Sequence, residues 1–193
     1  RAETGMRRFL FALILLLPAA PALGQRHMIV APHPLAAEAG RGVLRDGGSA
    51  LDSAIAAAVM LTLVEPQASG IGGGGLMLHF EEETGTLQAW DGREAAPAAA
   101  TPRLFLRPDG QPMSFGEAME GGRAVGAPGL LRMLEAAHRE HGRLPWARLM
   151  EPTIRAAQQG FAVTPRLSAA IGATAAALRR NGVARAYFLD GDG

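Results

Sequence analysis

The chain has 193 residues, of which 48% are hydrophobic and 19% charged, a composition that supports a buried core and argues against intrinsic disorder. Its 19 basic residues, all arginine, nearly balance 18 acidic residues, so no excess positive charge is available to bind nucleic acid. With two Trp, one Tyr and seven Phe, a platform for base stacking is also not expected.

The beginning of the chain has the pattern of a secretory signal peptide. Arg7 and Arg8 form a short basic region, the apolar run 9–17 follows, and a segment of small residues ends at Gly24. This order predicts export and cleavage between Gly24 and Gln25. The apolar run is too short to cross a bilayer as a helix, so we expect no membrane attachment after the signal peptide is removed.

We therefore divide the chain into residues 1–24, the upstream residues and signal peptide, and one domain at residues 25–193. Residues 1–5 precede the start methionine, Met6, and are left out of the fold. The chain has no cysteine, which excludes disulfides, thiolate catalysis and cysteine zinc sites. The signal peptide predicts a periplasmic or secreted location, where a protein without disulfides depends on its core for stability.

Two helices are predicted at the start of the domain. Residues 35–45 have a helical pattern, and the glycine-containing segment 46–48 ends it. Ser49, with Asp52 three residues later, is typical of a helix N-cap and opens the apolar run 54–64. Because this second helix is apolar on nearly every side, we expect it to be buried.

A glycine-rich junction and a β-hairpin come next. In the stretch VEPQASGIGGGGLMLHF (residues 64–80), five of the six positions 70–75 are glycine. Residues 76–80 and 86–90 have strand character, and the polar segment 81–85 between them ends in glycine. This pattern predicts a hairpin with the glycines between a helix and its first strand.

The second half of the chain is predicted to be mostly helical. Residues 129–141 and 145–159 have amphipathic helical patterns, and residues 164–180 form a third such segment. No internal repeat is visible. The order of helices, hairpin and helices indicates an α+β fold.

The glycine run could be a phosphate loop, a linker or a tight packing corner. A Walker-type loop needs a lysine and a Ser or Thr after its last glycine, whereas Leu76 and Met77 follow here. A dinucleotide fingerprint needs a strand before the glycines and a helix after them, which is the reverse of the predicted order. We therefore expect Gly72 to Gly75 to let a strand and the buried helix before it pack backbone to backbone.

Several separated segments resemble the γ-glutamyltransferase (γ-glutamyltranspeptidase) family of N-terminal nucleophile hydrolases. VEPQASGIGGGGLMLHF and WDGREAAPAAAT are similar to the start of the family's large subunit. Three further segments look like family segments in family order: GVLRDGGSALDSAIAAAVMLTLVEP, VGAPGLLRMLEAAHREHGRLPWARLMEPTIRAAQQGFAVTPRL and ARAYFLDGDG. The resemblance extends over residues 28–193.

The resemblance implies both a fold and a reaction. The chain would be an incomplete N-terminal portion of an αββα sandwich, taken from the large subunit. Family members cleave themselves, and the new N-terminal threonine of the small subunit attacks the γ-glutamyl group of glutathione or a related compound. That threonine and the oxyanion-hole glycines would lie beyond residue 193, so no catalytic residue is assigned within the chain.

The same resemblance implies the partners. The free α-amine of an N-terminal threonine can act as its own base, so neither a metal nor an organic cofactor is expected. The acyl-enzyme would pass the γ-glutamyl group to water or to an amino acid. Besides this small-molecule substrate, the expected partners are the remainder of the large subunit and the small subunit.

One residue of the chain matches a substrate-binding residue of the family. The family arginine of a DxRE stretch binds the α-carboxylate of the γ-glutamyl group, and in the stretch Asp91-Gly92-Arg93-Glu94 this residue is Arg93. A guanidinium suits that role because it can donate two parallel hydrogen bonds to a carboxylate. Alternatively, Arg93 pairs only with Asp91 or Glu94 at the strand end.

Three other polar clusters have simpler explanations than metal binding. His138 and His141 lack the spacing of the H-E-x-x-H motif, and they precede Gly142 at a helix end, where histidine interacts favourably with the helix dipole. The acidic run 81–83 suits a solvated hairpin tip, and the segment 190–193 suits a turn better than a calcium loop.

Two other functions remain possible from the sequence. Related acylases of β-lactam side chains and capsule-processing transpeptidases share the superfamily. A secreted, truncated pseudoenzyme without catalytic activity is the other possibility. The sequence beyond residue 193 would distinguish them, because a reading frame that reaches a threonine nucleophile favours an enzyme.

Overall fold

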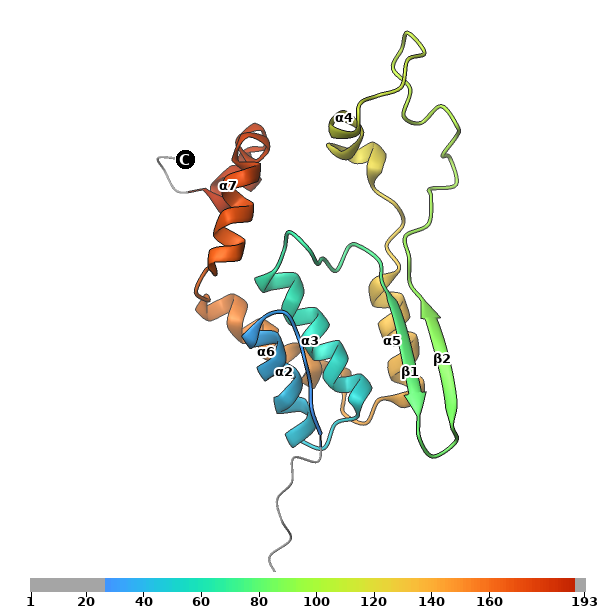
Figure 1. Cartoon of the computed structure of the whole chain (residues 1–193), viewed down its shortest axis with the longest axis vertical. Coiled ribbons are helices and arrows are strands. Elements are labelled where there is room, and N and C mark those ends of the chain that lie inside the picture. The colour runs from blue at the N-terminus through green and yellow to red at the C-terminus, as the bar shows by residue number, and fades with distance from the viewer. Residues whose placement is uncertain (1–26, 190–193) are drawn as a thin grey trace, which may run out of the picture.

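The computed structural model describes residues 27–189, so the predicted signal peptide and the predicted turn at 190–193 lie outside the described residues. The described part contains seven α-helices, one 3₁₀ turn and one two-stranded antiparallel sheet (Figure 1). Helices precede and follow the hairpin, and the α+β class with a mostly helical second half is confirmed.

The first two helices form as predicted. Helix α2 (Pro34–Arg45) begins with a proline, which suits a first helical turn, and ends before Gly47 at φ +88°. Helix α3 (Ala50–Val64) begins four residues before the predicted apolar run. Its N-terminus has a complete capping box, in which Ser49 and Asp52 each accept the other's backbone N–H.

The predicted hairpin is also present. Strands β1 (Leu76–Glu81) and β2 (Thr86–Asp91) pair antiparallel, from Leu76 opposite Asp91 to Glu81 opposite Thr86. Gly85 has a φ of +67° and closes the turn, as glycine can without strain. Met77 and Trp90 face the helices and pack against the core. Alternate residues point to the opposite face of the hairpin.

Three later helices match their predicted ranges to within one residue. These are α5 (Leu130–His141), α6 (Trp146–Gln159) and α7 (Pro165–Arg180). Three shorter elements were not predicted: α4 (Phe115–Met119), the 3₁₀ turn Gly122–Ala124 and α8 (Gly182–Phe188).

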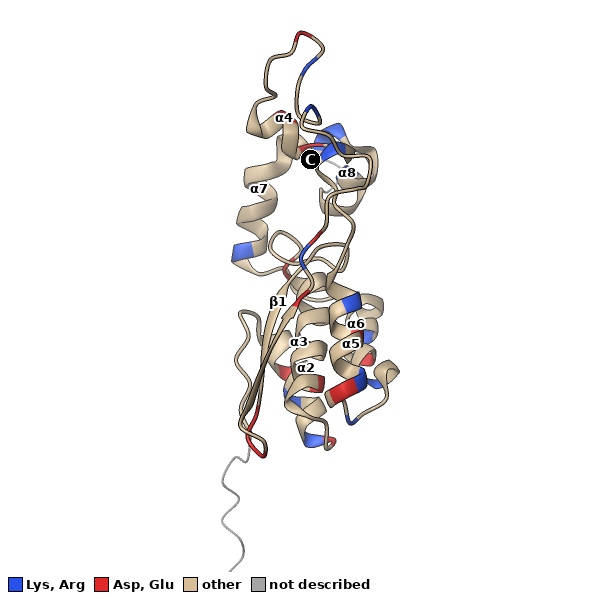
Figure 2. Cartoon of the chain, turned by 90° about the vertical axis from the view of Figure 1, so that its right-hand side faces the viewer, with Lys and Arg blue, Asp and Glu red and all other residues tan. Residues whose placement is uncertain are grey.

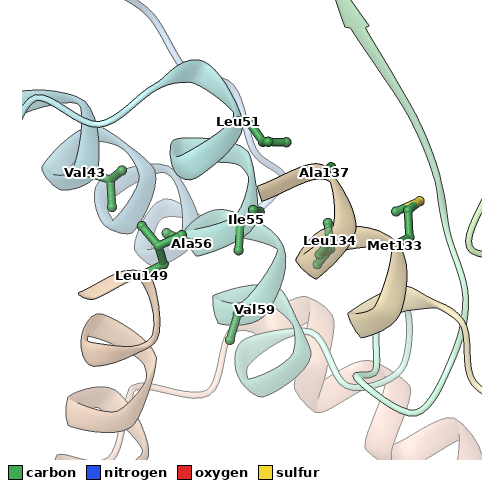
Figure 3. Packing of buried hydrophobic residues seen from close by; sticks show 9 residues of the cluster. All are labelled: Val43, Leu51, Ile55, Ala56, Val59, Met133, Leu134, Ala137 and Leu149. Atoms are coloured by element: carbon green, nitrogen blue, oxygen red, sulfur yellow. The ribbon is translucent and has the colours of Figure 1, made fainter. Parts of the chain in front are cut away.

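Helix α3 lies at the centre of the molecule, as its composition predicts. Helices α2 and α6 pack against it on one side and α5 on the other (Figure 1). Figure 3 shows Ile55 of α3 between Leu149 of α6 and Leu134 of α5, and all three side chains are buried. The hairpin covers the outer side of α5 through Trp90.

A buried carboxylate ties α3 to the loop between α5 and α6. Asp52 is fully buried, and its Oδ2 accepts the backbone N–H groups of Ser49, Arg143 and Leu144 at 3.0, 2.9 and 3.0 Å. The same side chain that caps α3 therefore also fixes a loop about 90 residues away in the sequence.

Most charged residues, apart from the buried Asp52 and Glu65, lie away from the core. Figure 2 shows them on the outward faces of the helices and, on the hairpin, mainly at its tip and at the end of β2. Within residues 27–189, no helix is both long enough and apolar enough to cross a membrane.

Candidate substrate-binding site

The segment that follows β2 is fixed on both sides by backbone hydrogen bonds. Gly75 and Gly92 exchange two such bonds, with N–O distances of 3.2 and 2.9 Å. Ala95 and Ala127 exchange two more, at 3.2 and 2.8 Å. Residues 92–95 are thereby held as a continuation of the strand.

The glycine run meets the N-terminus of α5 as well. The carbonyl of Gly73 accepts the backbone N–H groups of Gly129 and Leu130, at 3.2 and 3.1 Å. A close backbone approach between glycines and a helix was predicted, but the predicted partner, the buried helix α3, was wrong. A hydrogen-bonded turn at 65–69 separates α3 from the glycines, and the helix that reaches them comes from a later part of the chain.

The close backbone spacing explains directly why positions 74 and 129 are glycine. A Cβ built on Gly129 would lie 2.4 Å from the carbonyl oxygen of Gly92, and a Cβ on Gly74 would lie 2.8 Å from the same atom. Since none of the glycines at positions 70–75 has positive φ, the need is for space and not for an unusual backbone conformation. Gly72 has open space around it, and nothing in the structure explains its glycine.

Arg93 lies in the middle of this fixed segment. Its backbone N–H donates to Asp91 Oδ1 at 2.9 Å, and its guanidinium Nη2 lies 3.5 Å from Glu94 Oε2. Of the two alternative partners named from the sequence, Glu94 lies near the guanidinium, whereas Asp91 accepts the backbone N–H of Arg93. The arginine side chain is nevertheless 65% exposed, so most of its donors remain available to a ligand.

Shifted pKa values occur elsewhere in the chain. Hydrogen bonds from Arg107 and then Ser114 lower the pKa of Glu117 to about 2. A hydrogen bond from Arg41 lowers the pKa of Glu38. Both carboxylates are exposed members of local ion pairs, so these shifts do not indicate a second site.

His138 and His141 point to different surroundings. His138 Nε2 lies 2.9 Å from the carbonyl oxygen of Leu144, whereas the ring of His141 stacks on His79 with 4.1 Å between ring centroids. Among residues 27–189, no group of three or more histidine, aspartate or glutamate residues is placed to hold a metal ion. The acidic run 81–83 lies at the hairpin turn.

Two glycines near Arg93, Gly126 and Gly129, were not recognised from the sequence as part of its surroundings. The Glu94 side chain occupies the space next to Gly74, and a Cβ built on Gly126 would lie 2.8 Å from the Cβ of Glu94. Glycines at 126 and 129 were visible in the sequence. Their partners were not, because they lie more than 30 residues away along the chain.

Comparison with known proteins identifies the family. Residues 36–193 match the family model described as gamma-glutamyltranspeptidase. The chain belongs to this family.

Two curated relatives match most of this chain. A glutathione hydrolase proenzyme of Bacillus subtilis is 38% identical over 170 residues, which are 88% of this chain and 29% of the relative. The acylase ACY 1 proenzyme of a Pseudomonas species is 38% identical over 176 residues, which are 89% of this chain and 31% of the relative. The chain thus spans less than a third of the length of either relative.

A solved structure agrees with the fold. The γ-glutamyltranspeptidase of Helicobacter pylori superposes with a TM-score of 0.81 at 31% identity, covering 87% of this chain and 48% of that chain. The helices and the hairpin are therefore a portion of the N-terminal nucleophile hydrolase fold of these enzymes.

Proposed function

We propose that the chain is the N-terminal part of the large subunit of a γ-glutamyltransferase or glutathione hydrolase. The family match, and relatives that carry the names glutathione hydrolase and proenzyme, support this proposal. The reaction would move the γ-glutamyl group of glutathione or a related compound to water or an amino acid. A threonine outside this chain would carry the group as an acyl-enzyme.

In this scheme the chain contributes substrate binding. The guanidinium of Arg93 would hold the α-carboxylate of the γ-glutamyl group and so place the scissile bond near the nucleophile. The observation that best supports this role is that the backbone around Arg93 is fixed while its side chain is exposed. Backbone bonds hold residues 92–95 on two sides, while the Arg93 side chain is 65% exposed.

The hairpin gives a separate reason to expect further protein. Leu76, Leu78 and Phe80 of β1 and Leu87 of β2 are mostly exposed on the face turned away from α5. An apolar face of this kind is rarely left open to water. The rest of the large subunit and the small subunit would cover it as the second half of an αββα sandwich.

The site of action would be the periplasm or the medium outside the cell. The signal-peptide pattern of residues 1–24 supports export, and the near balance of charge gives no reason to expect nucleic acid as a partner.

The proposed role of Arg93 can be tested in a full-length enzyme. In such an enzyme, residues 36–193 of this chain would replace the matching segment of the Bacillus subtilis glutathione hydrolase proenzyme. Removing one member of a desolvated charge pair costs about 2 to 5 kcal/mol, or roughly 30- to 3000-fold in kcat/KM. We expect Arg93→Ala to cause this loss, and Arg93→Lys a smaller one because the ammonium lacks the planar fork.

The decisive comparison uses two substrates, a γ-glutamyl anilide and its analogue without the α-carboxylate. Arg93→Ala should impair only the first, and self-cleavage should continue. Arg155→Ala on α6 is a matched control, since Arg155 is a similarly exposed arginine paired with Glu151. An equal loss on both substrates, or an unprocessed precursor, would assign Arg93 to the fold.

The second candidate function is amide hydrolysis by a related acylase. The acylase ACY 1 relative, at the same 38% identity as the glutathione hydrolase, keeps this alternative open. The same two substrates, with a β-lactam side-chain amide added, separate the two activities. A non-catalytic role would follow if the full-length protein carrying this segment turned over none of them.

A further inference from the structure

The side chain of Glu94 occupies a space that three glycines create. A Cβ on Gly74 would lie 2.5 Å from Glu94 Oε2, and a Cβ on Gly73 would lie 3.4 Å from Oε1. On the opposite side, a Cβ on Gly126 would meet the Cβ of Glu94 at 2.8 Å. The carboxylate is therefore confined by the glycine run, and the stem of the side chain by the segment that leads into α5.

This confined carboxylate is next to the guanidinium of Arg93. Glu94 Oε2, the atom nearest the Gly74 position, is also the atom that lies 3.5 Å from Arg93 Nη2. The glutamate side chain is 32% exposed, against 65% for the arginine. A half-buried, sterically confined carboxylate is thus paired with a largely exposed guanidinium.

We propose that Glu94 is a positioning residue, whose carboxylate is seated against Gly74 and orients the Arg93 guanidinium toward a ligand carboxylate. This inference rests on the proposed role of Arg93 in binding substrate. A guanidinium has five N–H donors, so one side can face Glu94 while another presents two donors to the ligand. Gly74 contributes by leaving room for the glutamate.

If Glu94 orients Arg93, neutralising Glu94 should weaken substrate binding; if Glu94 acts only through its charge, neutralising it should strengthen binding. As a negative charge near the site, Glu94 repels a substrate carboxylate, so neutralising it would strengthen binding. As a positioning group it reduces the freedom of the arginine, so neutralising it would weaken binding. The substitution Glu94→Gln keeps the size of the side chain and removes the charge, and it therefore distinguishes the two.

The first experiment measures the arginine directly, in the full 193-residue chain. NMR relaxation of the Arg93 Nε–Hε group reports its mobility. We expect Glu94→Gln to make this group more mobile. Arg132 and Glu135 on α5 form a matched control pair, also at 3.5 Å but with the arginine 79% exposed, and Glu135→Gln should leave Arg93 unchanged. An Arg93 side chain already as mobile as Arg132 in the unsubstituted chain would overturn the proposal.

The second experiment tests whether the space beside Gly74 holds the Glu94 carboxylate in place. Gly74→Ala places a methyl group 2.5 Å from Glu94 Oε2 and 2.8 Å from the carbonyl oxygen of Gly92, so it should displace the glutamate and mobilise Arg93 as Glu94→Gln does. Gly72→Ala is the matched control in the same run, because a Cβ there meets nothing within 4 Å. If Gly74→Ala prevents folding, the Glu94→Gln result decides alone. Equal Arg93 mobility in folded Gly72→Ala and Gly74→Ala chains would contradict the claim that the position of Glu94 against Gly74 restrains Arg93.

The third experiment is kinetic and uses the full-length enzyme described above. A partly exposed ion pair contributes up to about 1 kcal/mol, so Glu94→Gln should raise KM for the γ-glutamyl anilide by about twofold to fivefold. The kcat value and the analogue without the α-carboxylate should change little. A fall in KM would show repulsion without positioning. If Arg93→Ala behaves as proposed and Glu94→Gln does not, only this inference fails. If Arg93→Ala impairs both substrates equally, the proposed substrate-binding role of Arg93 fails as well.

Discussion

Two arginine side chains, those of Arg107 and Arg93, have different environments. Arg107 is engaged by Glu117, which also caps α4 through Ser114, so arginine, carboxylate and helix end form one local unit. Arg93 has one longer contact with Glu94 and remains largely exposed. The first arrangement uses its charges to stabilise local structure, whereas the second leaves donors free, which is why the candidate site is placed at Arg93.

The Glu117 unit predicts a measurable pH dependence. Arg107, and then Ser114, lower the pKa of Glu117 from 4.5 to about 2. Because the folded-state pKa is depressed, the stabilisation is present above the unfolded value near 4.5 and is lost as the pH falls toward 2. We expect Arg107→Ala to raise the Glu117 pKa toward its ordinary value in an NMR titration of the side-chain carboxyl. Glu38, whose pKa Arg41 lowers, is the internal control and should not move.

The role of a glycine could be predicted from the sequence where it depends only on neighbouring residues in the chain. Gly85 and Gly47 close turns with positive φ, and their neighbours in the sequence show it. Gly74 and Gly129 are different, because each makes room for atoms at residues 92–94. A sequence shows that such a glycine is unusual, but the partner that requires it is set by tertiary packing.

Among the elements, length and end signals decide what could be predicted. Helices α3, α5 and α7 are 12 to 16 residues long, and their apolar spacing or capping residues define them. Helix α4 has five residues and α8 has seven, too few to show a period. The capping box at Ser114 was the available signal for α4.

The acidic residues of the two capping boxes, Asp52 and Glu117, should differ widely in how much their removal lowers the free energy of unfolding. Asp52→Ala leaves three backbone N–H groups without their acceptor, two of them in the loop between α5 and α6. At about 1 to 3 kcal/mol for each buried unsatisfied group, the loss should be on the order of 3 kcal/mol or more. Urea denaturation of the chain measures it.

Glu117→Ala is the matched control for this substitution. It removes the same position of a capping box, but in an exposed helix, and the further contact of this carboxylate is with the exposed side chain of Arg107, ten residues away, and not with backbone N–H groups of a distant loop. We expect Glu117→Ala to change the urea midpoint only slightly. Equal midpoint shifts for Asp52→Ala and Glu117→Ala would show that Asp52 acts only as a helix cap and not as a link between α3 and the loop.

At the scale of the whole molecule, the core was predictable and the site was only partly so. The all-apolar helix α3 had to be central, and it is. Arg93 was proposed as a site residue because its neighbours in the sequence carry the family resemblance. Beyond its sequence neighbours Asp91 and Glu94, the surroundings of Arg93 were not predicted, since they come from residues 73–75 and 126–130, which only folding brings to this segment.

The last prediction concerns catalysis by the chain alone. The chain spans 29% of the Bacillus subtilis glutathione hydrolase proenzyme, and in our proposal it contributes a carboxylate-binding arginine but no nucleophile. Orientation and charge cannot replace an acyl-accepting group at useful rates. We therefore expect the purified 193-residue chain to show no hydrolysis or transfer with a γ-glutamyl anilide, under conditions in which the Bacillus enzyme is active. Turnover that co-purifies with the chain, is absent from a mock purification and disappears in Arg93→Ala would mean that this segment contains its own nucleophile, and the proposed division of work between this chain and a threonine elsewhere would be wrong.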